Sequence, residues 1–155
     1  MIATKLAKSN RKVIITSGYF NPLHIGHINL IREAKKLGGF LVVIVNNDKQ
    51  VKIKGKTPFM IESERIEIIK ELRSVDDVFL SIDKDISVAE SLKAVAKKYL
   101  NTELFFAKGG DRHSGNIPEN ETLVCQKYNI KVVDGVGGGK VQSSSWLLKN
   151  AVKSK

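Results

Sequence analysis

The hydrophobic pattern along the chain alternates between two kinds of segment. Short, continuously apolar runs rich in β-branched residues occur at 12–16 (KVIIT) and 40–45 (FLVVIV), and weaker runs of the same kind occur at 75–82, 103–107 and 130–134. Runs of this length and composition are typical of strands that are buried on both faces. The pattern therefore predicts five strands.

Segments with helical periodicity separate these runs. A first helix is predicted to begin near Gly26 and to end at the Gly38-Gly39 pair, because glycine commonly ends a helix. Its apolar face consists of Leu30, Ile31, Ala34 and Leu37. A second helix is predicted from the spacing of its apolar residues, Ile66, Ile69 and Leu72.

Three further helices are predicted in the second half of the chain. Ser87 and Glu90 are spaced as a capping box at the start of the third helix. Pro118 suits the first turn of the fourth helix, and Ser144 or Ser145 is expected to cap the last one. The inward residues are expected to be Val88, Leu92, Val95, Ala96 and Tyr99 in the third helix, Leu123, Val124 and Tyr128 in the fourth, and Leu147, Leu148, Ala151 and Val152 in the last.

Alternating strands and helices, with strands that are apolar throughout, predict a parallel sheet that is covered on both faces. The predicted fold class is therefore α/β: a Rossmann-like, doubly wound parallel five-stranded sheet with helices on both faces. No internal repeat or low-complexity linker divides the sequence, so residues 1–155 are expected to form a single domain with a basic N-terminal extension at 1–11. In such sheets, ligands bind beyond the carboxyl ends of the strands.

Length and composition indicate the cellular compartment in which the protein is expected. The chain has 155 residues, of which 42% are hydrophobic, and its longest apolar run, 40–45, is far shorter than the roughly 20 residues that cross a bilayer. The N-terminal residues are basic but lack the apolar segment of a signal peptide. The single cysteine, Cys125, has no partner for an internal disulfide and is expected to pack within a helix. We therefore expect a cytoplasmic protein that does not insert into a membrane.

The net charge adds a hint about partners. Lys and Arg number 26 against 16 Asp and Glu, which gives a formal charge of +10. A field of this sign attracts nucleic acid, anionic membranes or phosphorylated small molecules. Charge alone does not choose among these partners, and a solvated basic surface explains it equally well.

The stretch TSGYFNPLHIGHINLI (16–31) is the most informative part of the sequence. His24 and His27 stand where the first strand gives way to the first helix, and a helix N-terminus is a site for anions because its N–H groups are unpaired. Two imidazoles one turn apart can both donate hydrogen bonds to one phosphate, which Gly26 would not obstruct. The structural alternative has one histidine capping the helix and the other half-buried.

The frame GYFNPLHIGH resembles the HxGH signature of the nucleotidyltransferase superfamily. It is most similar to the cytidylyltransferase-like branch, which includes glycerol-3-phosphate cytidylyltransferase and the adenylyltransferase domain of bifunctional heptose-phosphate enzymes. The resemblance covers nearly the whole chain. Its further motifs are NND (46–48), KIKGKTPF (52–59), ESER (62–65), LRSVDDV (72–78), AKGGD (107–111) and QSSSWL (142–147).

The resemblance implies an enzyme that moves CMP or AMP from CTP or ATP, with Mg²⁺, onto a small phosphorylated alcohol, sugar or phosphonate. The acceptor oxygen would attack the α-phosphorus in line and release pyrophosphate. His24, His27 and Lys54 would be catalytic. The residues implied in substrate binding are Gly18, Tyr19, Phe20, Gly26, Asp48, Lys56, Arg65, Arg73, Gly109, Gly110, Asp111, Lys140, Ser143, Ser144 and Ser145.

Specific roles follow for some of these residues. Lys54 and Lys56 would lie on a mobile loop over the β- and γ-phosphates, and Arg65 and Arg73 would clamp the acceptor's phosphate. Asp111 would hold the base, the ribose or a magnesium ion. The three serines at 143–145 would offer hydroxyls and helix amides to the triphosphate. No metal site made by the protein itself is expected, and a homodimer is implied by resemblance only.

Departures from the glycerol-3-phosphate branch leave the acceptor open. That branch has Asp in place of Asn21, Thr in place of Tyr19 and Arg where this loop offers Lys140. The motif at 107–111 favours a sugar phosphate and ATP, and the alternative is an adenylyltransferase of the sugar-phosphate or flavin type. No residue settles the choice of base, and CTP is only slightly favoured for the chain as a whole.

Two other hypotheses compete with this one. HIGH (24–27) is also the signature of class I aminoacyl-tRNA synthetases, but the second signature, KMSKS, is absent and the chain is too short for an anticodon-binding domain. A non-catalytic Rossmann-like module that binds nucleotide or nucleic acid is the alternative from another class. The enzyme hypothesis predicts no nucleic-acid partner.

Overall fold

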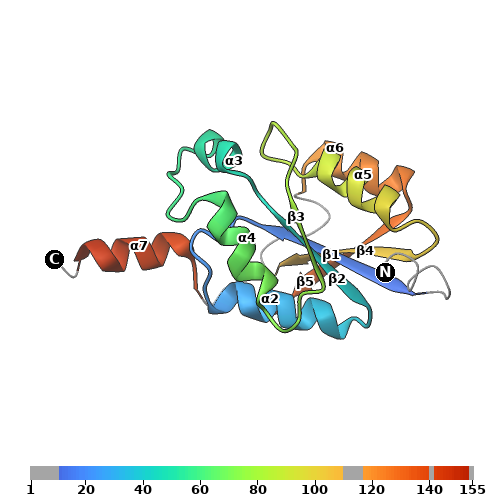
Figure 1. The fold of residues 1–155 in the computed structure, drawn as a ribbon, viewed down its shortest axis with the longest axis horizontal. Coiled ribbons are helices and arrows are strands. Elements are labelled where there is room, and N and C mark those ends of the chain that lie inside the picture. The colour runs from blue at the N-terminus through green and yellow to red at the C-terminus, as the bar shows by residue number, and fades with distance from the viewer. Residues whose placement is uncertain (1–10, 110–116, 140–141, 154–155) are drawn as a thin grey trace.

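A parallel sheet of five strands forms the centre of the computed structural model, which describes residues 11–109, 117–139 and 142–153. The strands stand in the order β3-β2-β1-β4-β5, and every neighbouring pair is parallel (Figure 1). Their bounds are Lys12–Gly18 for β1, Phe40–Val45 for β2, Asp77–Leu80 for β3, Glu103–Gly109 for β4 and Ile130–Val136 for β5. The five predicted strands are confirmed, with β3 shorter than the run at 75–82.

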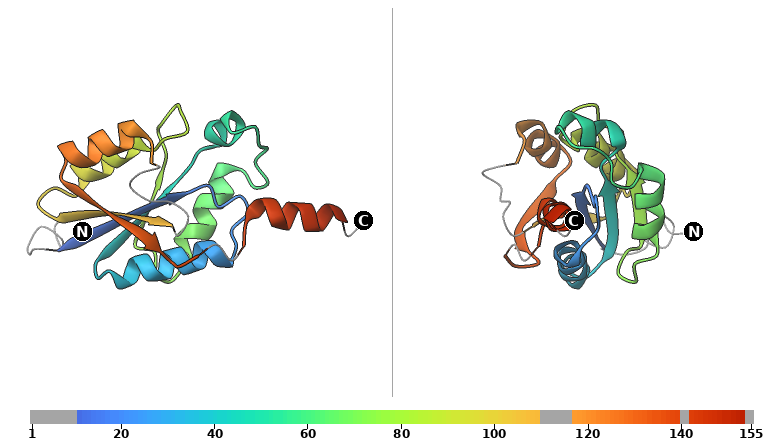
Figure 2. Two further views of the ribbon diagram at one scale, coloured as in Figure 1. Left: turned by 180° about the vertical axis from the view of Figure 1, so that it is seen from behind. Right: turned by 90° about the vertical axis from the view of Figure 1, so that its left-hand side faces the viewer.

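Helices cover both faces of the sheet, which confirms the doubly wound α/β class (Figure 2). One face packs against α2 (Ile25–Lys36) and α4 (Glu62–Lys70). The other face packs against α5 (Ala89–Lys98) and α6 (Glu119–Lys127). Two more helices, α3 (Asp48–Ile53) and α7 (Ser144–Lys153), lie beyond the carboxyl ends of the strands (Figure 1).

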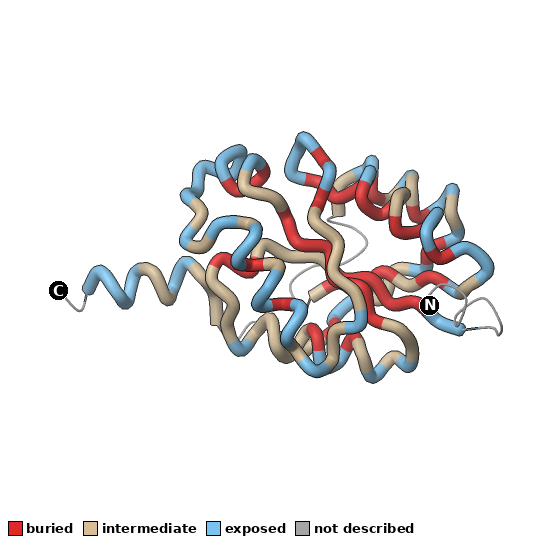
Figure 3. The backbone as a smooth tube through the Cα atoms, in the orientation of Figure 1, coloured by how far each residue is buried: buried red, intermediate tan, exposed pale blue. Residues whose placement is uncertain are grey.

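The two central strands are apolar throughout because alternate residues face opposite helical layers. In β1, Val13 and Ile15 contribute to the core against α5 and α6, whereas Ile14 contributes to the core against α2 and α4. In β2, Val42 contributes to the core against α5 and α6, and Val43 contributes to the core against α2 and α4. These side chains are fully buried, as the red segments at the centre of Figure 3 show.

The short helix α3 was not foreseen from the sequence. Its six residues, DKQVKI, bury only Gln50 and Val51, which is too few for a helical period to be visible. Asn47 begins the helix through a capping box in which its side chain accepts from the Gln50 N–H at 2.9 Å. The side chain of Gln50 then donates to the carbonyl oxygens of Asp85 and Ser87, which ties α3 to the loop before α5.

The predicted capping box of α5 is wrong. Its N-cap residue is Val88, and the carboxylate of Asp83 takes the place of a local cap. Asp83 accepts from the N–H of Glu90 at 2.7 Å and from the N–H of Ser91 at 3.0 Å. The cap is contributed from seven and eight residues away, so the local pattern Ser-x-x-Glu gives no sign of it.

Two predicted inward faces differ from the structure. In α6, Leu123 is exposed, whereas Glu121 and Cys125 are buried. In α7, no described residue is buried, and the helix projects away from the sheet (Figure 1). Trp146 lies on this helix with 46% of its surface exposed and does not pack against the sheet.

Among the helices that the structure describes, none is long and apolar enough to cross a membrane.

Replacing Asp83 by Ala should lower the free energy of unfolding by about 1–3 kcal/mol, because two amides of α5 and the Ser91 hydroxyl lose a buried acceptor. Replacing Glu90 by Ala should change it by less than about 0.5 kcal/mol, since the Glu90 side chain is exposed and does not cap the helix. Urea unfolding of the two variants measures the difference. Equal losses of unfolding free energy in the two variants would show instead that Glu90 caps α5, as the local motif predicted.

Candidate active site

A cavity of about 880 Å³ opens beyond the carboxyl ends of β1 and β4. From β1 the chain builds the sheet outward through β2 to β3 on one side, and from β4 it continues to β5 on the other. The cavity therefore lies where the strand order reverses, which is the point at which doubly wound sheets bind ligands. Its lining comes from the ends of β1, β4 and β5, the start of α2, the loop after α3 and the start of α7.

The structure brings together most of the residues that the sequence predicts for the site. The lining includes Gly18, Tyr19, Phe20, His24, Gly26, His27, Lys54, Lys56, Gly109, Ser143, Ser144 and Ser145. Gly110, Asp111 and Lys140 lie outside the described residues.

The histidine pair stands at the N-terminus of α2 with both rings fixed by the backbone. The Nδ1 atom of His24 accepts from the Gly26 N–H at 3.1 Å, and the Nδ1 atom of His27 accepts from the His24 N–H at 3.2 Å. The rings stack with centroids 3.8 Å apart and planes inclined by 26°. Because both Nδ1 atoms accept, each neutral ring carries its proton on Nε2.

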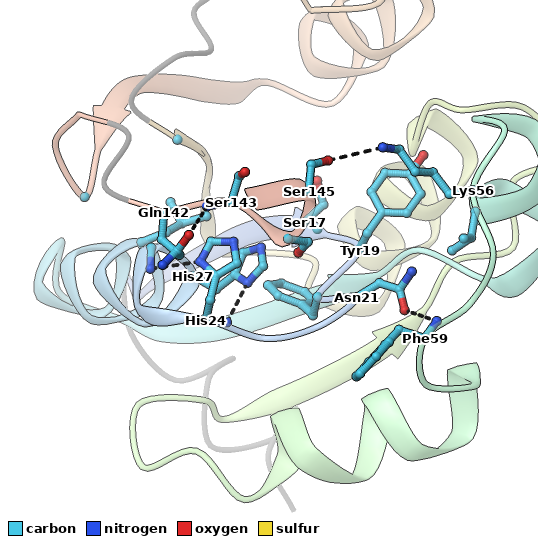
Figure 4. Close-up of a pocket in the computed structure, with 18 of the residues that line it drawn as sticks. Ser17, Tyr19, Asn21, His24, His27, Lys56, Phe59, Gln142, Ser143 and Ser145 are labelled. Carbon is cyan, nitrogen blue, oxygen red and sulfur yellow. Dashed lines mark hydrogen bonds between the residues drawn. The ribbon is translucent and has the colours of Figure 1, made fainter. Parts of the chain in front are cut away.

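This geometry combines the two interpretations of the motif. His24 is the N-cap of α2, as the structural alternative required. The cap uses only Nδ1, so it fixes the ring without consuming the Nε2–H donor. Figure 4 shows both imidazoles side by side in the lining of the cavity. Both imidazoles therefore lie in the cavity lining with Nδ1 engaged by the backbone.

His27 is neutral at physiological pH. Burial, and secondarily the neighbouring charge of His24, lowers the pKa of His27 to about 4. The ring also meets the edge of the buried Phe20 ring, with centroids 4.9 Å apart. His27 therefore enters the site as an imidazole that donates a hydrogen bond rather than as a preformed cation.

Two glycines are required by these rings. A Cβ atom on Gly26 would stand 2.9 Å from Cε1 of His24, and one on Gly18 would stand 2.8 Å from Cζ of Phe20. The sequence suggested that Gly26 leaves space for a phosphate, but the first atoms that a side chain would meet belong to the imidazole of His24. Gly26 allows the capping ring to lie against the helix.

Positive charge stands across the cavity from the histidines. Nζ of Lys54 lies 4.7 Å from the centre of the Tyr19 ring, and Nζ of Lys56 donates to Oγ of Ser145 at 3.2 Å. Figure 4 shows Lys56 and Tyr19 at the opposite end of the view from His24 and His27. The cavity thus has neutral donors at one end and ammonium groups at the other, an arrangement that suits an extended polyanion.

The serines at the start of α7 have separate roles. Ser143 caps the helix by accepting from the Trp146 N–H at 3.0 Å, so the predicted cap by Ser144 or Ser145 is wrong. Ser144 donates to the carbonyl of Pro22 at 2.9 Å, which joins α7 to the loop before α2. All three serines line the cavity, and Ser145 contacts Lys56.

Arg65 and Asp48 do not line the cavity in the described structure, which corrects the role predicted for each. Arg65 is 1% exposed, and Nη2 of its guanidinium pairs with Oδ1 of Asp48 at 2.7 Å. The other hydrogen bonds of this guanidinium go to backbone carbonyls. A side chain that is buried and satisfied in this way holds chain segments together and does not present itself to an acceptor phosphate.

Arg73 lies at the wrong end of the sheet for the predicted clamp. It is exposed in the connection that leads from α4 into the amino end of β3. In a parallel sheet the amino and carboxyl ends of the strands are opposite edges. Arg73 is therefore separated from the cavity by the length of the strands.

Several lining residues were not among the predicted site residues, and three of them, Asn21, Gln142 and Lys108, have polar side chains with identifiable neighbours. Asn21 hydrogen-bonds the loop that carries the lysines, and Gln142 lies beside the histidine pair (Figure 4). Lys108 is 3% exposed and pairs with Glu121 at 3.1 Å. Each of the three lies inside a motif quoted above, GYFNPLHIGH, AKGGD or QSSSWL, but a motif does not reveal a hydrogen-bond partner 36 residues away, such as that of Asn21.

Within the residues that the structure describes, no group of three or more His, Cys, Asp or Glu side chains is placed to hold a metal ion.

The family model described as cytidylyltransferase-like matches residues 15–149. The chain belongs to the cytidylyltransferase-like family. The predicted membership of the nucleotidyltransferase superfamily is confirmed, and this cytidylyltransferase-like protein is a nucleotidyl-transferring enzyme.

Several curated proteins are similar to this cytidylyltransferase-like chain. The FAD synthase of Thermococcus sibiricus is 34% identical over 129 residues, which cover 83% of this chain and 82% of that protein. The bifunctional protein HldE of Desulfatibacillum aliphaticivorans is 37% identical over 108 residues, which cover 68% of this chain but 20% of that protein. The FAD synthase of Ferroglobus placidus is 43% identical over 75 residues, and about half of each chain is covered.

A solved structure is also similar. It is the crystal structure of the lipopolysaccharide core biosynthesis protein from Thermoplasma volcanium, with a TM-score of 0.66 and 27% identity. The match covers 84% of this chain and 99% of that one.

The stability of the protein should fall as pH drops from about 6.5 to about 4, partly because of His27. In this window the unfolded chain binds a proton at His27 that the folded chain does not, so folding becomes less favourable. The loss should be about 1–3 kcal/mol, since one pKa unit corresponds to about 1.4 kcal/mol and the ring is only partly buried.

Urea unfolding of wild type and His27→Asn at pH 7 and pH 4 isolates this contribution. Between pH 7 and pH 4 the free energy of unfolding should fall less in the variant than in wild type, because the variant has no imidazole to protonate at this position. A difference between the two proteins that does not change with pH would contradict the lowered pKa.

Proposed function

We propose that this enzyme transfers AMP from ATP to the phosphate of a phosphorylated small molecule and releases pyrophosphate. An oxygen of the acceptor's phosphate attacks the α-phosphorus, a new P–O bond forms, and the bond from the α-phosphorus to the bridging oxygen breaks. The observation that carries the proposal is the pair of Nε2–H donors fixed at the N-terminus of α2, with two lysines across the cavity.

Each end of the cavity suits one part of this reaction. Negative charge builds on the oxygens around the α-phosphorus as the acceptor attacks, and donors that are already oriented stabilise that charge without reorganising. His24 and His27 would donate to these oxygens. Lys54 and Lys56 would neutralise the β- and γ-phosphates and the departing pyrophosphate.

Support for ATP in place of CTP comes from the relatives. FAD contains an AMP unit, so a FAD synthase that starts from a flavin mononucleotide must transfer AMP. The other resemblance, to bifunctional heptose-phosphate enzymes, is also to an adenylyltransferase domain. The slight preference for CTP drawn from the sequence rested on no particular residue, so we propose ATP as the donor.

Mg²⁺ would enter this site with the nucleotide. The described lining offers hydroxyl and amide oxygens but no carboxylate, and Mg²⁺ in nucleotide sites is commonly held by substrate phosphates. The ion therefore belongs to the Mg–ATP substrate. EDTA in excess should stop turnover without lowering the melting temperature of the free protein.

Pyrophosphate release from ATP and from CTP, each with Mg²⁺, tests the proposal. The acceptor panel is FMN, sugar 1-phosphates and glycerol 3-phosphate. We expect turnover with ATP and with either FMN or a sugar phosphate, and the acceptor that works identifies the substrate class. Turnover with CTP and glycerol 3-phosphate alone would overturn the choice of nucleotide.

Replacing His27 by Asn should lower kcat by about 10²–10³-fold while ATP binding changes little, because the lost donor acts mainly in the transition state. The Asn side chain keeps an acceptor for the His24 N–H, so the loop before α2 should stay in place. Isothermal titration with ATP measures binding separately from turnover. ATP binding by the wild type without release of pyrophosphate in the presence of any acceptor would instead favour a non-catalytic nucleotide-binding module.

A further inference from the structure

Asn21 fastens the segment 57–60, which directly follows the two lysines. Its Nδ2 donates to the carbonyl of Thr57 at 3.1 Å. Its Oδ1 accepts from the N–H of Phe59 at 2.6 Å and from the N–H of Met60 at 3.2 Å (Figure 4). Only 9% of Asn21 is exposed, so water competes weakly for these three bonds.

Arg65 fastens the far end of the same segment. Its Nε donates to the carbonyl of Met60 at 2.9 Å. Its Nη1 donates to the carbonyl of Tyr19 at 2.8 Å and to that of Asn46 at 2.6 Å. The ion pair with Asp48 completes the contacts. The loop after β1, the end of β2, the start of α3 and the segment 57–60 therefore meet at one buried guanidinium.

The two lysines stand between the end of α3 and this fastened segment. Only residues 54–56 separate Ile53, the last residue of α3, from Thr57. Gly55 turns the chain between the two lysines with a φ of 77°. A connection this short has few ways to place its side chains once both of its ends are fixed.

We propose that Asn21 and Arg65 are positioning residues that present Lys54 and Lys56 to the triphosphate. The assignment rests on the proposed function, because that function gives the lysines their phosphates. It also limits the expected mobile lysine loop to residues 54–56. The segment behind the lysines is part of the fixed frame of the site.

The contacts give a reason for Asn rather than Asp at position 21. An aspartate keeps acceptors for the N–H groups of Phe59 and Met60 but has no donor for the Thr57 carbonyl. One of its carboxylate oxygens would face the carbonyl oxygen of Thr57, where the Nδ2 atom of Asn21 makes its 3.1 Å hydrogen bond. Asn21→Asp should therefore release the Thr57 end alone, whereas Asn21→Ala releases all three contacts.

Brief tryptic digestion of the native protein, with fragments identified by mass spectrometry, tests the fastening without any need for turnover. Asn21→Ala should raise the initial rate of cleavage after Lys54 and Lys56 by about tenfold or more relative to cleavage elsewhere in the chain, because local opening exposes this connection. Asn21→Asp should give a smaller rise at the same bonds.

Asn120→Ala is the matched control. Asn120 also makes three hydrogen bonds, but they involve Asp85, Ser87 and Glu121, and it does not line the cavity. Loss of these bonds should not change cleavage after Lys54 or Lys56. Equal cleavage there in Asn21→Ala and Asn120→Ala would overturn the proposal, and so would a rise that is uniform along the chain.

A double-mutant cycle with Lys56→Ala tests the positioning role in catalysis. Asn21→Ala should lower kcat/KM for ATP by about tenfold in the wild-type background but by less than about threefold when Lys56 is absent, because it acts through that lysine. Additive losses would overturn a role through Lys56. Absence of turnover in wild type would refute the proposed function, and the digestion would still decide whether Asn21 fastens the segment.

Discussion

The backbone amides that hold the two imidazoles are the contacts on which the site depends. Without them each ring could rotate or exchange tautomers, and the pair would not present two Nε2–H groups together. The donors of these contacts are the N–H groups of His24 and Gly26, at the start of α2. β1 and α2 meet at this junction, so the sheet order that places β1 at the centre also places the histidines at the switch point.

Much of this could be predicted from the sequence, for identifiable physical reasons. A buried strand must be apolar on both faces, and a histidine pair at a strand-to-helix junction has few other uses, so 12–16 and 24–27 carry strong local signals. The strand and helix periods then imply the doubly wound fold. The carboxyl-end rule gives the edge of the sheet that holds the site.

The failures share a different cause. Arg65 and Lys56 are both basic residues near the same loop, yet Arg65 is buried on backbone carbonyls and Lys56 reaches across the cavity. Which basic residue is buried depends on carbonyls contributed by distant segments, and a sequence does not reveal them. The cap of α5 by Asp83 has the same origin, since its donors lie beyond the range of local motifs. Long-range polar contacts are therefore the part of this structure that the local sequence pattern does not predict.

The two ends of the cavity differ in how firmly they are held, and this difference suits a reaction that releases pyrophosphate. The histidine end is fixed by the backbone, whereas the lysine end is joined to α7 by the Lys56–Ser145 hydrogen bond. That contact is exposed, so water competes for it, and a triphosphate could replace Ser145 as the partner of Lys56 at little cost. In the proposed reaction, the groups around the α-phosphorus must not move during the attack, whereas the groups that bind the departing phosphates must release them.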